Sequence, residues 1–225
     1  MKPHDKQQPT IKETLSNIIY NYRYPLLSIL GITILGLIGL GIYNSVMADR
    51  IEEATIIIER IEEDFQTWKT AEQDDEWESM RLELLTRIDS VLESYSRLYP
   101  AQRGYLLKGH IAYVSEDWAA AATYYETLAD TFPDSYLAPV ALMNGAVAME
   151  HAEDFAAAEA FYQRVTNSYE NAPNMPYALF SLGRVREMLE DYNGAVTAYN
   201  KLLERYPNSY WTNLGRNRII YLETR

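Results

Sequence analysis

The chain has 225 residues, a length that suits one or two domains, and its 48% apolar and 23% charged residues are typical of a folded protein. Its net charge of −12 disfavours nucleic-acid binding, because an acidic chain repels phosphate backbones. The absence of cysteine excludes disulfides, thiolate metal sites and a cysteine nucleophile. The charge is also uneven, since residues 1–47 carry +2 and the remainder carries −14.

A long apolar segment lies near the N-terminus. The 25 residues between Arg23 and Asp49 have no formal charge and are rich in Leu, Ile and Gly. A helix of that length, at about 1.5 Å per residue, crosses a hydrocarbon layer of about 30 Å. We therefore predict a transmembrane helix over 24–48. The alternative is a cleaved signal peptide with Val46 and Ala48 at its cleavage site, although this run is longer than a signal core.

The basic residues on the N-terminal side of this segment predict its orientation. They are Lys2, Lys6, Lys12 and Arg23. Short cytoplasmic flanks carry an excess of Lys and Arg, so we expect residues 1–23 to be a cytoplasmic tail. The rest of the chain then lies outside the cytoplasm.

Two amphipathic helices are predicted over 49–101, because apolar residues recur there at spacings of three and four. The first stripe is Ile51, Ala54, Ile58, Ile61, Phe65 and Trp68, and the second is Leu85, Ile88, Leu92 and Tyr95. A polar stretch at 73–76 separates the two stripes. We interpret them as a degenerate helical hairpin. The alternative is a parallel coiled coil that continues from the membrane helix.

From residue 102 onward the sequence repeats itself, with copies that begin at 102, 139 and 176. Each copy holds a small residue, an acidic–aromatic pair, an alanine and a tyrosine at fixed offsets. In the three copies these are Gly109, Asp117-Trp118, Ala121 and Tyr125; Ala146, Asp154-Phe155, Ala158 and Tyr162; and Gly183, Asp191-Tyr192, Ala195 and Tyr199. Small residues allow two helices to approach closely, so each copy predicts one helical hairpin.

Proline closes two of the three copies, because it cannot continue a helix. These prolines are Pro133 and Pro207, whereas Glu170 occupies the equivalent position of the central copy. The residues between copies predict that the next first helix is lengthened at its start, with Ser135 as a cap. After the third copy, residues 210–223 contain Trp211, Leu214 and Gly215, which predict one terminal capping helix.

This pattern resembles the tetratricopeptide-repeat (TPR) superfamily, in which each unit is a helical hairpin of about 34 residues. The resemblance covers 102–225 and implies an all-α solenoid of about three repeats. A short N-terminal tail, one membrane helix and an external array are similar to the ancillary subunit family of the bacterial Sec translocon. Members of that family associate with the translocon and with periplasmic chaperones. The resemblance implies a single-pass inner-membrane protein whose TPR domain is periplasmic.

The TPR resemblance also implies a binding groove on the concave side, lined by the first helix of each hairpin. Carried over by position, the groove residues are Arg103, Leu106, His110, Tyr113 and Val114; Val140, Met143, Val147, Glu150 and His151; and Tyr177, Phe180, Arg184, Glu187 and Met188. This mostly apolar and aromatic set suits an extended segment or an amphipathic helix of a partner protein. Only Asn144 matches the carboxylate clamp of some TPR domains, which disfavours capture of a C-terminal carboxylate.

The sequence lacks the usual signatures of catalysis. It has no phosphate-cradling glycine loop, no HExxH and no nucleophile elbow, and its three histidines are His4, His110 and His151. We therefore expect neither an enzyme, nor a cofactor, nor a metal site. The predicted function is that of a membrane-anchored adaptor or scaffold that binds proteins or peptides and assists secretion or envelope assembly. The alternative is a structural envelope protein that self-associates into a homo-oligomer.

Overall fold

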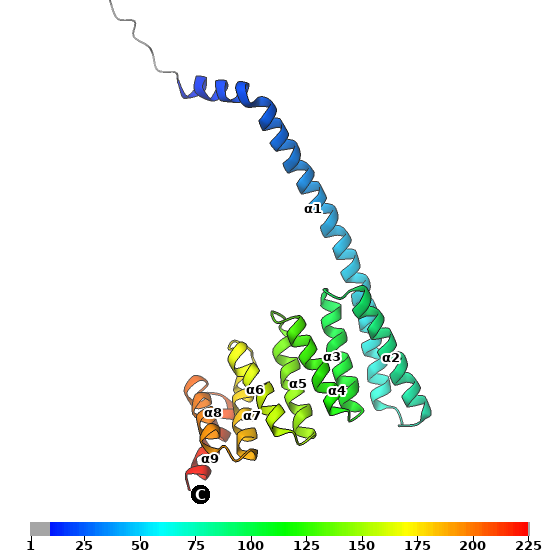
Figure 1. The fold of residues 1–225 in the computed structure, drawn as a ribbon, viewed down its shortest axis with the longest axis vertical. Helices are drawn as coiled ribbons and strands as arrows, with labels where there is room; N and C mark the ends of the chain where they lie inside the picture. The colour runs from blue at the N-terminus through cyan, green and yellow to red at the C-terminus, as the bar shows by residue number, and fades with distance from the viewer. Residues whose placement is uncertain (1–9, 225) are drawn as a thin grey trace, which may run out of the picture. The chain divides into compact units, whose positions relative to one another are not determined.

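The computed structural model describes residues 10–224, and every regular element in that range is an α-helix (Figure 1). The predicted all-α fold is confirmed. The chain divides into two compact units, which meet between Glu52 and Glu53.

The first unit contains most of α1, the helix that spans Ile11–Thr70. Its apolar side chains from Leu26 to Val46 are exposed, and within residues 10–224 it is the one helix long and apolar enough to cross a membrane. The helix starts before the predicted span of 24–48 and continues beyond it. Residues 11–23, predicted as a tail, are therefore helical. A signal sequence near the N-terminus also meets these criteria of length and composition, so the finding fits a membrane span or a signal anchor.

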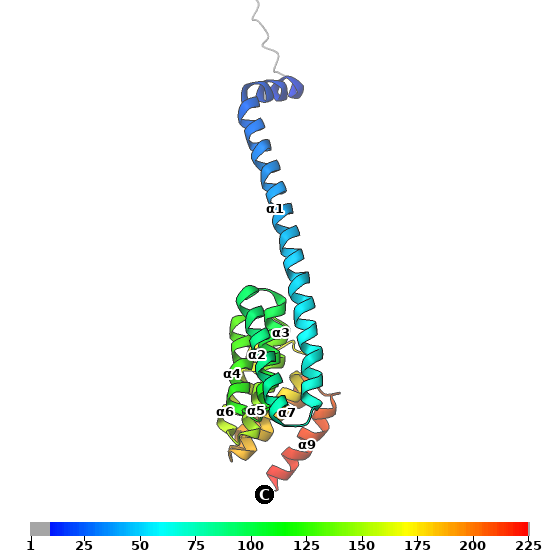
Figure 2. The same ribbon diagram turned by 90° about the vertical axis from the view of Figure 1, so that its right-hand side faces the viewer.

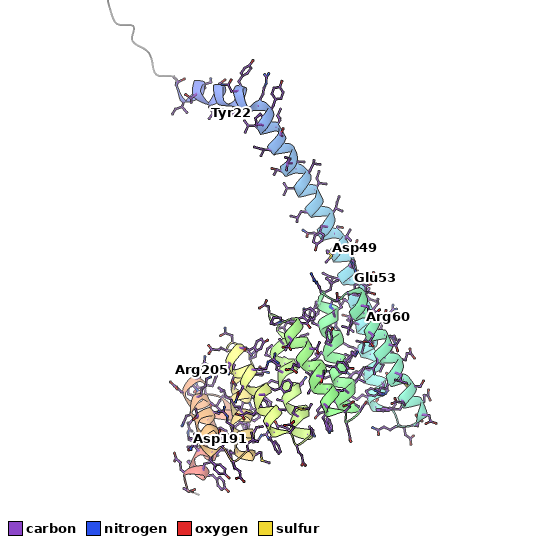
Figure 3. All side chains as sticks on the ribbon, viewed as in Figure 1. Tyr22, Asp49, Glu53, Arg60, Asp191 and Arg205 are labelled. Atoms are coloured by element: carbon purple, nitrogen blue, oxygen red, sulfur yellow. The ribbon has the colours of Figure 1, made fainter. Side chains whose placement is uncertain are left out.

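Helix α1 bends at Tyr22, where the backbone leaves helical geometry (φ −106°, ψ 15°; Figure 3). Pro25 lies three residues further on. A proline inside a helix has no N–H for the bond to the carbonyl four residues before it, and its ring crowds that carbonyl. The bend is therefore a local consequence of the sequence.

The second unit begins with a hairpin made of the end of α1 and α2 (Asp75–Ser94). Ile58, Ile61 and Trp68 are fully buried and belong to one apolar cluster with residues of α2 and α3. The indole N–H of Trp68 donates to the carbonyl of Trp77 at 2.9 Å, and the two rings stack at 4.6 Å. From Ala54 to Trp68 the apolar stripe of this segment is thus covered within the chain, whereas Ile51 is 39% exposed.

Three further hairpins and a terminal helix complete this unit. Their helices are α3 (Tyr99–Val114), α4 (Trp118–Thr131), α5 (Leu137–His151), α6 (Phe155–Ser168), α7 (Met175–Met188), α8 (Tyr192–Arg205) and α9 (Tyr210–Glu223). Each helix packs on the next along the chain. Figure 2 shows the first helices α3, α5 and α7 on one side of the row and the second helices α4 and α6 on the other. The structure therefore has the two-layered arrangement of a helical solenoid.

The same turn joins the two helices in each of the hairpins α3–α4, α5–α6 and α7–α8. Asp117, Asp154 and Asp191 cap α4, α6 and α8, because each carboxylate accepts a hydrogen bond from the backbone N–H three residues later. The residue before each cap is a glutamate in the left-handed region, with φ of 59°, 59° and 62° at Glu116, Glu153 and Glu190. Such backbone is costly for a residue with a side chain.

The helices of a hairpin approach closely where the sequence has its small residues. A methyl group at Gly183 would lie 2.7 Å from Tyr199 Cζ, and the equivalent position at Gly109 would crowd Tyr125 in the same way. Tyr125, Tyr162 and Tyr199 are almost fully buried. The small residues and the tyrosines of the motif are therefore core, as predicted.

The first helices were expected to be lengthened at their starts, and the structure shows this for α3 and α5. Helices α3 and α5 begin at Tyr99 and Leu137, ahead of the copy starts at 102 and 139. The Ser135 hydroxyl accepts a hydrogen bond from the N–H of Leu137 at 3.1 Å. Helix α7 begins at Met175, one residue before its copy start, because the loop without the expected proline is longer.

Candidate functional site

Some of the predicted groove residues lie at the surface of the first helices. We call the exposed surface of α3, α5 and α7 the first-helix face. Two adjoining hollows lie on it and share Val147 as a common wall. The hollow between α3 and α5 measures 200 Å³ and is lined by His110, Tyr113, Tyr125, Asn144 and Val147. The hollow between α5 and α7 measures 280 Å³ and is lined by Val147, Glu150, His151, Tyr177 and Arg184.

Polar side chains link neighbouring hairpins across the second hollow. Arg184 donates to Glu150 Oε1 at 2.7 Å, and the Tyr162 hydroxyl donates to the same oxygen at 2.6 Å. The side chain of Arg184 is 41% exposed, whereas that of Glu150 is 14% exposed. The arginine therefore keeps donors on the surface while its partner carboxylate is enclosed.

The same arrangement recurs one repeat later. Glu187 accepts hydrogen bonds from the Tyr199 hydroxyl, at 2.6 Å, and from Arg218 of α9. Burial alone would raise the pKa of Glu187, but the hydrogen bonds from Arg218 and Tyr199 outweigh it and lower that pKa below its ordinary value. Glu187 is thus a carboxylate held in its charged form by α9, and it does not line either hollow.

The first hollow is neutral. Burial lowers the pKa of His110, and the nearby charge of Lys69 lowers it further, while Glu62 acts in the opposite direction. The His110 ring stacks on Phe65 with centroids 6.2 Å apart, and its Nε2 lies 3.4 Å from the Asn144 amide nitrogen. The imidazole is therefore uncharged near neutral pH and presents an aromatic wall.

An aromatic cluster lies beside the two hollows. His151 stacks on Trp118 with centroids 4.8 Å apart, and Tyr113 makes edge contacts with both rings at 4.9 and 5.4 Å. His151 is exposed at the end of α5. Tyr113 and His151 were predicted to line the groove, but Trp118 was assigned only to the repeat pattern. Aromatic residues recur at this position of the repeat, at 118, 155 and 192, and in the first repeat the Trp118 ring packs on Tyr113 and His151, which line the hollows.

Several predicted groove residues lie outside the hollows. Met143 is 5% exposed and belongs to the core. Leu106 packs against the same core, and Phe180 contacts the rings of Tyr199 and Trp211. Arg103 is bound to Glu62, with its Nε 3.0 Å from Glu62 Oε1. Local packing therefore buries Met143 and leaves the other three side chains half-buried and outside the two hollows.

Comparison with protein families explains the repeat. Residues 106–176 match a family model described as tetratricopeptide repeat, and residues 177–209 match a second model with the same description. The chain contains tetratricopeptide repeats. A search of curated proteins finds none that matches the chain. TPR domains are in general binding scaffolds without catalytic activity, so the repeats indicate a protein-interaction adaptor or scaffold.

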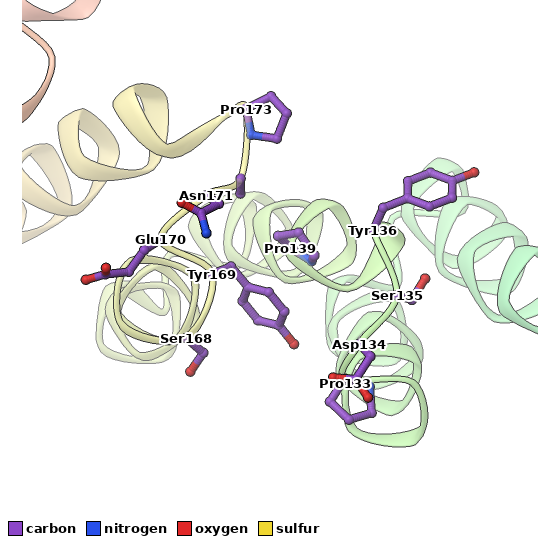
Figure 4. A pocket seen from close by; sticks show the side chains of 11 residues that line it. Pro133, Asp134, Ser135, Tyr136, Pro139, Ser168, Tyr169, Glu170, Asn171 and Pro173 are labelled. Atoms are coloured by element: carbon purple, nitrogen blue, oxygen red, sulfur yellow. The ribbon is translucent and has the colours of Figure 1, made fainter.

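A further hollow lies at the loops between the TPR hairpins. It measures 420 Å³ and opens between the loop after α4, which contains Pro133 and Tyr136, and the loop after α6. Figure 4 shows the ring of Tyr169 between these two loops. The sequence feature that indicates this hollow is Glu170, which stands where the other two repeats have their closing proline. The loop after α6 that contains Glu170 is longer than the loop after α4.

No metal site is formed by the part of the chain that the structure describes. Among residues 10–224, no group of three or more His, Asp or Glu side chains is placed to hold an ion. His110 and His151 instead make the ring contacts described above.

Proposed function

We propose that this protein is a membrane-anchored TPR adaptor that binds segments of partner proteins on its first-helix face. The observation that carries the proposal is the pair of adjoining hollows that share Val147. They combine aromatic and aliphatic walls with the exposed guanidinium of Arg184. A partner segment gains affinity by burying apolar side chains in such hollows, and a polar group at the edge fixes its orientation.

The expected ligand is an extended segment or one face of a helix. The two hollows lie in neighbouring hairpins, so a single segment that crosses α5 places one apolar side chain in each of them. Glu150 accepts from both Arg184 and Tyr162, which leaves the edge of the second hollow with unused donors rather than a free carboxylate. We expect hydrophobic segments with a carbonyl or an acceptor side chain near Arg184.

We infer that α1 anchors the protein and that the TPR domain lies outside the cytoplasm. The support is the exposed apolar surface of α1 together with the excess of Lys and Arg among residues 1–23. With this layout we assign the protein to a bacterial inner membrane and its TPR domain to the periplasm. There it would assist secretion or envelope assembly, in the manner of the ancillary Sec translocon subunits.

Site-specific crosslinking in cells tests the proposal. A photoreactive amino acid at Tyr113, Val147 or Tyr177 should give discrete adducts with partner proteins, because all three positions line the hollows. Ala160 is a matched control, since it is exposed on α6 in the other layer. A lack of adducts at all three positions, or the same adducts from Ala160, would contradict binding on the first-helix face.

The alternative of a self-associating structural protein has lost one of its supports. The stripe from Ile58 to Trp68 that suggested a coiled coil is buried against α2 and α3. Light scattering on the full chain in detergent micelles distinguishes the two functions. A monomer in dilute solution agrees with the adaptor, whereas a stable oligomer would favour the structural protein.

A further inference from the structure

We propose that residues 11–23 form an interfacial helix, which lies on the anionic surface of the membrane that the following part of α1 crosses. The inference rests on the proposed anchoring and adds to it a second, separate contact with lipid. The occupant of this helix face is therefore the headgroup region of a bilayer that contains anionic phospholipid.

The first observation is an exposed apolar stripe. Ile11, Leu15 and Ile19 recur every four residues, which places them on one side of the helix. Their exposed fractions are 88%, 58% and 54%. A short helix with such a stripe and a polar opposite face is typical of segments that lie in the plane of a membrane interface.

The second observation is the chemistry beside the stripe. Lys12 and Arg23 line a hollow of 440 Å³, together with Leu15, Ile19, Ser16 and Tyr20. Cationic groups next to aliphatic walls match a phospholipid, whose phosphate is anionic and whose chains are apolar. Lys and Arg side chains also reach from an apolar surface towards headgroups. Residues 1–23 carry a charge of +2, so attraction to an anionic leaflet acts along the whole segment.

The third observation is the aromatic ring cluster next to the bend. The Arg23 guanidinium carbon lies 4.7 Å from the centre of the Tyr20 ring and 4.9 Å from that of Tyr24. Tyrosines are enriched at the level of the headgroups, where their rings are in apolar surroundings and their hydroxyls reach water. The cluster therefore marks the depth at which α1 enters the bilayer.

The fourth observation is the bend at Tyr22. Its backbone dihedrals interrupt the helix between the amphipathic residues and the continuous apolar run that starts at Leu26. A straight helix would carry Lys12 and the polar face away from the interface. The bend allows the segment before it to lie along the surface while the segment after it enters the hydrocarbon layer.

Nitroxide scanning in vesicles tests the inference, and the absence of cysteine makes single labels straightforward. Full-length Ile19→Cys and Asn21→Cys proteins are labelled and reconstituted into equimolar phosphatidylcholine and phosphatidylglycerol. These two positions are on nearly opposite sides of the helix. We expect several-fold greater relaxation by oxygen, relative to a water-soluble nickel complex, at position 19 than at position 21.

A third label separates the two levels of the proposal. At Leu35, in the apolar run, oxygen should dominate if α1 spans the membrane. Equal accessibility at 19 and 21, together with a lipid-buried label at 35, would overturn the interfacial helix and leave the anchoring intact. A water-accessible label at 35 would overturn the anchoring, and the interfacial helix with it.

The role of charge is tested in the same vesicles. The double variant Lys12→Gln, Arg23→Gln should reduce the contrast between positions 19 and 21 at least twofold, and vesicles of phosphatidylcholine alone should reduce it similarly. A contrast that is unchanged in both cases would overturn the preference for an anionic surface.

Discussion

Replacing Gly183 by alanine should destabilise the TPR domain, even though alanine is the better helix former. The added methyl group would lie 2.7 Å from Tyr199 Cζ and 2.8 Å from Cδ1. Carbon atoms in contact are normally about 3.5–4.0 Å apart, so the ring has to move by about 1 Å. It is not free to do so, because the Tyr199 hydroxyl is bound to Glu187 at 2.6 Å.

The expected loss combines two destabilising contributions with one stabilising contribution. Overpacking of a core costs about 1–3 kcal/mol, and weakening the hydrogen bond to the charged Glu187 costs about 1.5 kcal/mol more. The higher helix propensity of alanine returns about 1 kcal/mol. The free energy of unfolding should therefore fall by about 1.5–3.5 kcal/mol.

Urea unfolding of the full chain in detergent micelles, followed by circular dichroism, measures this loss. Gly215→Ala is the matched control, because its methyl group would lie 3.3 Å from Leu202 Cδ2 and 3.4 Å from Tyr199 Cδ1, which requires a shift of only a few tenths of an ångström. We expect that variant to be neutral or slightly stabilised. Equal stability of Gly183→Ala and the wild type, or equal losses in both variants, would refute the reasoning from ring contact.

The remaining predictions concern the turns and the buried carboxylate. Glu190→Gly should raise the free energy of unfolding by about 0.5–1 kcal/mol, because the φ of 62° is costly for a residue with a side chain. Glu190→Ala should not raise it, and equal urea midpoints for the two variants would exclude backbone strain. Since the pKa of Glu187 is lowered on folding, its stabilisation is complete above the ordinary value near 4.5 and is lost as pH falls through the folded pKa. Glu187→Gln should therefore flatten the decline in urea midpoint below about pH 4.5, and parallel declines would argue against this carboxylate.

The hairpins could be predicted because their determinants are local. Asp117 and its equivalents cap helices through atoms three residues away, and the small residues at Gly109 and Gly183 face the tyrosines of the same hairpin. Such contacts repeat with the sequence, so the period of 37 residues gave the number and order of the helices. The capping helix was predicted from the same pattern, and Trp211 packs on Tyr177 and Phe180 of the preceding hairpin.

The continuity of α1 and the composition of the hollows were not predictable in the same way. Charged residues at Asp49 and Arg50 suggested a boundary, yet no glycine or proline follows before Pro100, so nothing in the chain stops the helix there. The hollows depend on contacts between hairpins, where each repeat has different side chains. Met143 has the same place in its repeat as Leu106 and Phe180, but its helix packs more tightly on α4, which removes it from the surface.

The glutamates at the ends of α5 and α7 have a consequence for how the domain unfolds. Each shares its carboxylate with a tyrosine of its own hairpin and an arginine of the next first helix. Opening one repeat therefore removes a charged partner from the repeat before it, which links their unfolding. Detachment of α9 should thus destabilise α7 and then α5, so that the intact array unfolds in a single cooperative transition. Partial truncations of the array should unfold over a broader temperature range than the intact array.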